Sequence, residues 1–210
     1  ELLKQWWPPP QWPNSFFLRF KNAVLRCRVF FRFFMIKIET NRLLIKPYIK
    51  ADATLMALLH SNHEVMTFMK DRKPLSAVEA AATFARYQEC WEIDGFGIFS
   101  VRIKETDTFI GEAGFWHRQD KPGVSMWDLL DSPYWGQGYG SEMNVAITAW
   151  LFNETDVKSF WAVTQARNKG SVAILRRLGG VISETAHMGV EGLLRIDITR
   201  SAWKVSQAHT

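Results

Sequence analysis

The chain of 210 residues has the length of one large domain, or of one domain with an appendage. Its 47% hydrophobic and 22% charged residues are typical of a globular protein, which excludes a collagen, a coiled coil and a wholly disordered chain. The two cysteines, Cys27 and Cys90, are too few for a disulfide scaffold and have no partners at metal-ligand spacing. We therefore expect free thiols, a cytoplasmic protein and no bound metal.

The net positive charge is confined to the first 34 residues. The chain has 26 Lys and Arg against 21 Asp and Glu, and residues 1–34 hold six of the former and one of the latter. Residues 35–210 are therefore left with 20 basic and 20 acidic side chains. Because this body has no net charge, we expect no nucleic-acid partner for it and no polyanionic or polycationic substrate.

Residues 1–34 also differ from the rest in composition. They are rich in aromatic residues and proline, and their basic residues interrupt every long apolar run, which excludes a transmembrane helix. One interpretation is a basic amphipathic helix on an anionic membrane. We favour an N-terminal extension outside the native domain, because Met35 directly precedes a well-patterned strand. The domain is then residues 35–210, and we expect it to bind no membrane.

This domain alternates predicted strands and helices. Asp52 is expected to cap the first helix, and Ser76 with Glu79 forms a capping box for the second. Gly179 and Gly180 end the last helix. The predicted strands are residues 40–48, 96–104, 108–118, 124–130, 157–165, 181–187 and 193–203, and the predicted helices are residues 52–62, 76–94, 139–153 and 168–178. This order indicates a single mixed α/β domain.

A glycine-rich loop, residues 134–142, joins a predicted strand to a helix and carries Gly136, Gly138 and Gly140 at alternate positions. Bare backbone N–H groups at a helix N-terminus can cradle a phosphate or a pyrophosphate. The loop is not a P-loop, because no Lys-Ser/Thr pair follows its last glycine, and it lies too late in the chain for a dinucleotide fingerprint. A tight turn without a ligand is the alternative.

A second element, Asn168 to Ser171, opens the next helix, with Asn168 as its expected cap. Together the two elements resemble the GNAT acetyltransferase superfamily, whose main motif is Gln/Arg-x-x-Gly-x-Gly/Ala. Here the motif reads Trp135-Gly136-Gln137-Gly138-Tyr139-Gly140, with Trp in place of Gln or Arg. The loop, the Asn-x-x-Ser element, the opening at residues 40–45 and the Ile110-Gly111-Glu112 strand are similar to the branch of ribosomal-protein alanine and serine N-acetyltransferases. The resemblance covers residues 36–203.

This resemblance implies a fold and a cosubstrate. The fold would be α/β (α+β), a single GNAT domain whose mixed, mostly antiparallel sheet is splayed like a V and flanked by helices on both faces. The cosubstrate would be acetyl-CoA. Backbone N–H groups would hold its pyrophosphate, Leu129 and Leu130 would offer backbone groups to the pantetheine arm, and Asn168 would bond that arm or brace the loop. The pyrophosphate-binding residues would be Gly136, Gln137, Gly138, Tyr139, Gly140 and Ser141.

The implied reaction is direct attack of a primary amine on the thioester in a ternary complex. The acceptor would be a protein N-terminus or a small-molecule amine, bound near residues 71–75 and the last hairpin, by a monomer or a homodimer. Leu175 stands where many relatives have the Tyr that protonates the thiolate, and Ser171 would take that role here, also touching the cofactor. Ser125 stands where many have the basic Glu. The candidate bases are Glu112, Asp128, Glu191 and a water relay.

Other features are weaker signals. His60 and His63 lie three residues apart without a third ligand, so we interpret them as surface histidines. Five tryptophans are expected in the core or around an acceptor pocket: Trp91, Trp116, Trp127, Trp135 and Trp161. Leu175 and Ser125 would also suit the alternative function, a non-catalytic acyl-CoA-binding or regulatory module.

Overall fold

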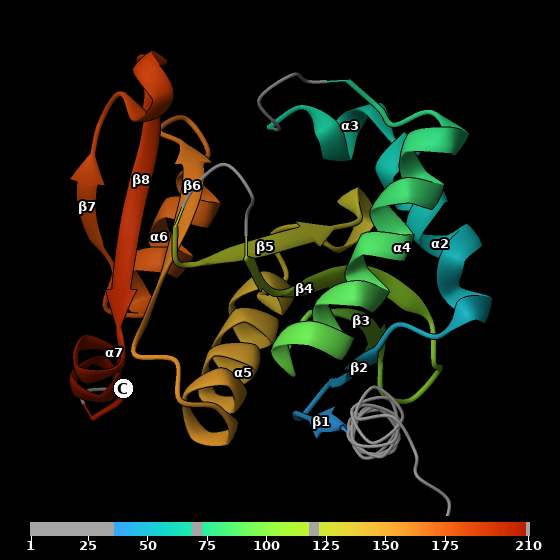
Figure 1. The fold of residues 1–210 in the computed structure, drawn as a ribbon, viewed down its shortest axis with the longest axis horizontal. Helices are drawn as coiled ribbons and strands as arrows, with labels where there is room; N and C mark the ends of the chain where they lie inside the picture. The colour runs from blue at the N-terminus through green and yellow to red at the C-terminus, as the bar shows by residue number, and fades with distance from the viewer. Residues whose placement is uncertain (1–35, 69–72, 118–121, 209–210) are drawn as a thin grey trace, which may run out of the picture. The chain divides into compact units, whose positions relative to one another are not determined.

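A single sheet organises the residues that the computed structural model describes, which are 36–68, 73–117 and 122–208 (Figure 1). In spatial order its strands are β1 (Ile38–Glu39), β2 (Leu43–Pro47), β3 (Ile98–Ile103), β4 (Phe109–His117), β5 (Val124–Leu130), β6 (Ser159–Gln165), β8 (Leu193–Thr199) and β7 (Val181–Glu184). Neighbouring strands are antiparallel except β5 and β6, which are parallel. The predicted mixed, mostly antiparallel sheet is confirmed, whereas the predicted extension at residues 1–34 lies outside the described residues.

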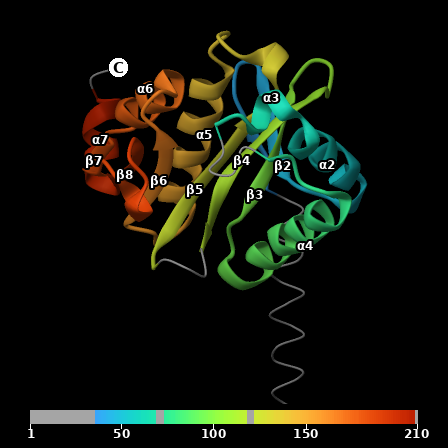
Figure 2. The same cartoon turned by 90° about the horizontal axis from the view of Figure 1, so that it is seen from above.

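Helices cover both faces of the central strands (Figure 2). The α-helices of the described ranges are α2 (Ala53–Ser61), α3 (His63–Met66), α4 (Ala77–Asp94), α5 (Tyr139–Glu154), α6 (Lys169–Arg177) and α7 (Arg200–Gln207), with short 3-10 helices at Lys50–Asp52, Ser132–Tyr134 and His187–Gly189. On one face, Tyr87 of α4 and Met56 of α2 pack with Ile98 of β3. On the other, α5 buries Met143 and Ile147. None of these helices is both long enough and apolar enough to cross a membrane.

The parallel pair β5 and β6 separates soon after it begins. Only Val124 with Phe160 and Ser125 with Trp161 are in register, although β5 continues to Leu130 and β6 continues beyond Trp161. The diverging arrows of β5 and β6 are visible in Figure 1. The predicted V-shaped opening is therefore confirmed, and the second half of β5 has no strand partner on its β6 side.

Most predicted elements are confirmed, but the end of the chain is not a strand. The predicted strand 193–203 stops at Thr199, whose hydroxyl accepts the N–H of Ala202 at 3.1 Å and so caps α7. Trp203 is buried one turn into that helix. The predicted first strand, residues 40–48, is likewise shorter and consists of β2 alone, because a turn separates Leu43 from β1, and α3 was not predicted.

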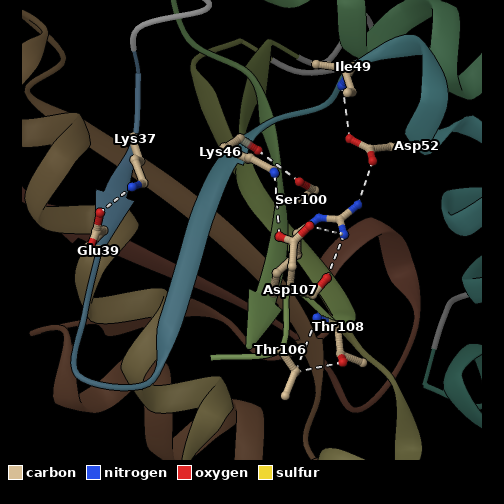
Figure 3. Close-up of polar contacts among 10 residues, drawn as sticks. Lys37, Glu39, Lys46, Ile49, Asp52, Ser100, Thr106, Asp107 and Thr108 are labelled. Carbon is tan, nitrogen blue, oxygen red and sulfur yellow. Dashed lines mark hydrogen bonds and ion pairs between the residues drawn. The ribbon is translucent and has the colours of Figure 1, made fainter. Parts of the chain in front are cut away.

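Asp52 has a different role from the predicted cap. It immediately precedes α2, yet its carboxylate lies 2.6 Å from the Arg102 guanidinium and accepts the N–H of Ile49 at 3.1 Å (Figure 3). Arg102 also donates to the carbonyl of Asp107 at 2.7 Å. The carboxylate oxygens of Asp52 therefore bind Arg102 and Ile49 and do not cap α2. The ion pair with Arg102 joins the start of α2 to the sheet.

Candidate active site

A cleft with a volume of about 680 Å³ opens where β5 and β6 separate. Its walls come from the end of β5, the glycine-rich loop and the first turns of α5 and α6. Of the residues predicted to bind the cofactor, these line it: Leu129, Leu130, Gly136, Gly138, Gly140, Ser141, Asn168 and Ser171. Gln137 and Tyr139 do not. The Gln137 side chain donates to the Pro133 carbonyl at 2.7 Å, and the Tyr139 ring lies against Tyr134.

The glycine-rich loop depends on backbone conformations that other residues avoid. Gly136 and Gly138 have φ angles of 71° and 83°, in the left-handed region. Gly138 is the N-cap of α5, so the loop delivers the first N–H groups of that helix to the cleft. The Trp135 indole N–H donates to the Leu130 carbonyl at 2.6 Å and anchors the loop to the end of β5.

The first turn of α6 forms the opposite wall. The side chain of Asn168 accepts the N–H of Ser171 at 3.2 Å, which confirms the predicted cap. Because Asn168 supplies the cap, the Ser171 hydroxyl is not required for it. Leu175, one turn later, is buried in the core rather than exposed to the cleft. The N-terminal ends of α5 and α6 therefore both face the cleft, and each carries a partial positive charge.

Several side chains that line the cleft were not predicted from the sequence. They are Val65, Phe68, Arg167, Lys169 and Arg177. The Arg167 guanidinium lies 5.6 Å from the Phe68 ring and donates to the Thr67 carbonyl at 3.2 Å. No local sequence pattern predicts the hydrogen bond between Arg167 and Thr67, which lie 100 positions apart. Of the expected acceptor region at residues 71–75, positions 71 and 72 lie outside the described residues.

Among the three candidate bases, only Asp128 lines the cleft. Burial raises the pKa of Asp128, and a hydrogen bond from Asn144, 3.3 Å away, opposes that rise in part. Glu191 is exposed in the turn before β8. Glu112 is fully buried beneath α2 and α4. The structure thus places Asp128 at the cleft and the other two carboxylates away from it.

Glu112 is the centre of a buried hydrogen-bonded cluster. Its Oε1 atom lies 2.7 Å from Nε2 of His60 and accepts from Tyr87 at 2.9 Å and from Trp127 at 2.6 Å, while Oε2 accepts from Tyr48 at 2.7 Å. Burial raises the pKa of Glu112, but His60 and these donors outweigh it, and the net shift is downward. Glu112 is therefore an ionised carboxylate whose hydrogen bonds join α2 and α4 to the sheet.

The prediction that His60 is a surface histidine is wrong. His60 is only 1% exposed, and its burial is possible because the carboxylate of Glu112 binds the imidazole inside the core. His63 is exposed, as predicted. Of the five tryptophans considered, only Trp135 lines the cleft. Within the described ranges, no three His, Cys, Asp or Glu side chains gather closely enough to hold a metal ion.

Glu112→Gln is expected to destabilise the fold by about 3 kcal/mol at pH 7. The substitution replaces the charged carboxylate that accepts four hydrogen bonds in the core with a neutral amide, which cannot accept all four. A carboxylate with a lowered pKa stabilises the fold above its ordinary pKa, and this contribution disappears as the pH falls through the lowered value. The difference between wild type and variant should therefore shrink in acid. Urea unfolding from pH 7 to pH 3 measures it, with exposed Glu191→Gln as the control; a difference independent of pH would contradict an ionised Glu112.

Comparison with known proteins agrees with this geometry. The family described as Acetyltransferase (GNAT) domain matches residues 42–181. An uncharacterized N-acetyltransferase, p20 of Bacillus licheniformis, is 26% identical over 158 residues, covering 74% of this chain and 84% of its own. The ribosomal-protein-S5-alanine acetyltransferase of Vibrio fischeri has a TM-score of 0.66 at 17% identity, covering 80% of this chain and 98% of its own.

A second similar structure is RimL, a ribosomal L7/L12 alpha-N-protein acetyltransferase in complex with coenzyme A. It has a TM-score of 0.66 at 14% identity, covering 80% of this chain and 99% of its own. At these identities the structures establish a shared fold. Because the family match spans most of the chain, from residue 42 to residue 181, the protein belongs to the GNAT acetyltransferases.

Proposed function

We propose that this acetyltransferase uses acetyl-CoA to acetylate a primary amine, which attacks the thioester directly in a ternary complex. The observation that carries the proposal is the cleft, in which an unpaired strand edge meets the N-termini of two helices. When bound, acetyl-CoA would supply the activated acetyl group. The residues that line the cleft are suited to bind the negatively charged diphosphate of this cosubstrate. The loop exposes backbone N–H groups, and positive charge is added by Arg167, Lys169 and Arg177.

The proposed binding roles follow the walls of the cleft. N–H groups of the four loop residues that line the cleft, Gly136, Gly138, Gly140 and Ser141, would hold the diphosphate at the start of α5. The part of β5 that ends at Leu130 has no β6 partner, so its backbone is available to the amide groups of the pantetheine arm. Asn168 caps α6 and keeps Ser171 at the wall of the cleft.

For proton transfer we propose Asp128 as the base and Ser171 as the donor to the departing thiolate. Asp128 has a raised pKa and a hydrogen bond from Asn144 that orients it. Glu112 suits the role of base less well, because its oxygens already accept four hydrogen bonds and its pKa is lowered. Since two similar structures are named as ribosomal-protein acetyltransferases, a protein N-terminus is the first acceptor to test and a small-molecule amine the second.

Acetyl-CoA is expected to raise the melting temperature, since ligand at 100 times its dissociation constant stabilises a protein by about 2.7 kcal/mol. Melting curves with acetyl-CoA, ATP and NAD measure this directly. Turnover is then followed with a panel of N-terminal peptides and small amines. A rise with ATP or NAD but not with acetyl-CoA would contradict the cosubstrate. Binding without turnover of any amine would favour the non-catalytic module.

Asp128→Asn is expected to lower kcat by about 100-fold, because the amide cannot accept the proton. The rate of the wild type should fall as the pH drops through the raised pKa of Asp128, and the variant should lose this acid limb. Profiles of kcat/KM against pH for both proteins measure it. Glu191→Gln serves as the control and should keep the wild-type profile. An unchanged acid limb in Asp128→Asn would remove Asp128 from the mechanism.

Ser171→Ala is expected to lower kcat by about 10- to 1000-fold while the dissociation constant of acetyl-CoA stays near the wild-type value, because its hydroxyl acts mainly in the transition state. The melting temperature should change little, since Asn168 provides the cap. Asn168→Ala is the comparison and should cost about 1 kcal/mol of stability. Full kcat in Ser171→Ala would assign the leaving-group proton to water or to another residue.

A further inference from the structure

The turn between β1 and β2 is hydrogen-bonded to the first turn of α5. The Glu142 carboxylate accepts the Thr40 hydroxyl at 2.6 Å and the backbone N–H of Arg42 at 3.0 Å through Oε1. Its Oε2 atom accepts Nε of Arg42 at 2.7 Å, and a second guanidinium nitrogen lies at the same distance. Two side chains and one backbone group thus converge on a single carboxylate about 100 residues away.

The same arginine also holds the glycine-rich loop. Its third guanidinium nitrogen donates to the Gln137 carbonyl at 3.0 Å, and the guanidinium carbon lies 4.1 Å from the centre of the Tyr139 ring. Arg42 therefore contacts the residues on both sides of Gly138. A Cβ atom at Gly138 would lie 3.4 Å from the guanidinium. Gly138 lines the cleft and Arg42 does not, so Arg42 supports the loop from outside the site.

Glu142 poses an electrostatic problem for an anion at this helix end. A carboxylate in the first turn is favourable for the helix itself, but it repels a second negative charge bound there. Partial burial raises the pKa of Glu142, yet the bonds from Thr40 and Arg42 outweigh it and the pKa is lowered. The carboxylate is therefore ionised, and Arg42 is the positive charge that balances it.

We propose that Arg42 is a positioning residue that keeps the loop in its ligand-binding conformation and neutralises Glu142, so that an anion can bind at the start of α5, and that Thr40 orients the Glu142 carboxylate for this contact. The inference rests on the proposed function, because the anion concerned is the diphosphate of acetyl-CoA. It assigns the turn between β1 and β2 a role in the affinity for the cosubstrate and none in the chemical step.

The test compares Arg42→Ala, Glu142→Gln and the double variant by calorimetric titration with CoA and by steady-state kinetics. Arg42→Ala leaves Glu142 unbalanced, so its dissociation constant for CoA and its KM for acetyl-CoA should rise at least tenfold at nearly unchanged kcat. The double variant should bind several-fold more tightly than Arg42→Ala, because the repelling charge is gone.

Arg42→Lys should restore affinity only in part, since lysine lacks the planar fork that reaches Glu142 and Gln137 together. Lys37→Ala, which removes an exposed ion pair with Glu39 on the same hairpin, should resemble wild type.

A second measurement separates this proposal from the proposed function. Without ligand, amide hydrogen exchange of residues 136–142 should be at least tenfold faster in Arg42→Ala than in Lys37→Ala, whatever the protein binds. If wild type binds no CoA, the proposed function fails, and the exchange rates alone decide whether the turn holds the loop. If wild type binds CoA and Arg42→Ala matches it in affinity and exchange, the positioning role is overturned while the function stands. Independent effects of the two substitutions in the double variant would overturn the neutralisation of Glu142.

Discussion

The short parallel contact between β5 and β6 is the constraint on which the rest of the site depends. Parallel neighbours need a crossover, and α5 supplies it, beginning directly after the loop that follows β5. Because the strands separate after Ser125 and Trp161, the end of β5 has no partner on one side, and it lines the same cleft as the start of α5. One feature of the topology therefore brings an unpaired strand edge, a turn rich in glycine and a positive helix end to the same cleft.

The carboxylates of Glu142, Glu112 and Asp128 lie in different electrostatic environments. Glu142 is balanced by Arg42, and Glu112 is held by four donors in the core beneath α2 and α4. The pKa is lowered in both cases. Asp128 differs, because burial raises its pKa and only one amide side chain opposes the shift. Two of the three carboxylates thus have lowered pKa values, and only Asp128 has a raised one, which is why we propose it as the base.

Local patterns were enough to predict the loop at residues 134–142 and the cap at Asn168, because glycine conformations and capping are decided by near neighbours. The burial of His60 was not predictable in this way, since its partner Glu112 lies 52 residues later and only the fold brings them together. The start of α7 did have a local signal, the capping hydroxyl of Thr199, but alternating apolar residues before it favoured a longer strand. The place of Arg167 in the cleft was not predictable either, because its partners Thr67 and Phe68 lie about 100 residues earlier.

A crystal structure of the chain with bound CoA tests the central claim most directly. We expect the diphosphate to accept hydrogen bonds from N–H groups of Gly136, Gly138, Gly140 and Ser141, and the pantetheine arm to run along the unpaired half of β5 toward Ser171. The strands β5 and β6 should remain apart, with the turn at Arg42 still bound to Glu142. CoA bound on another face, or in the cleft without contact to the glycine-rich loop, would contradict this interpretation.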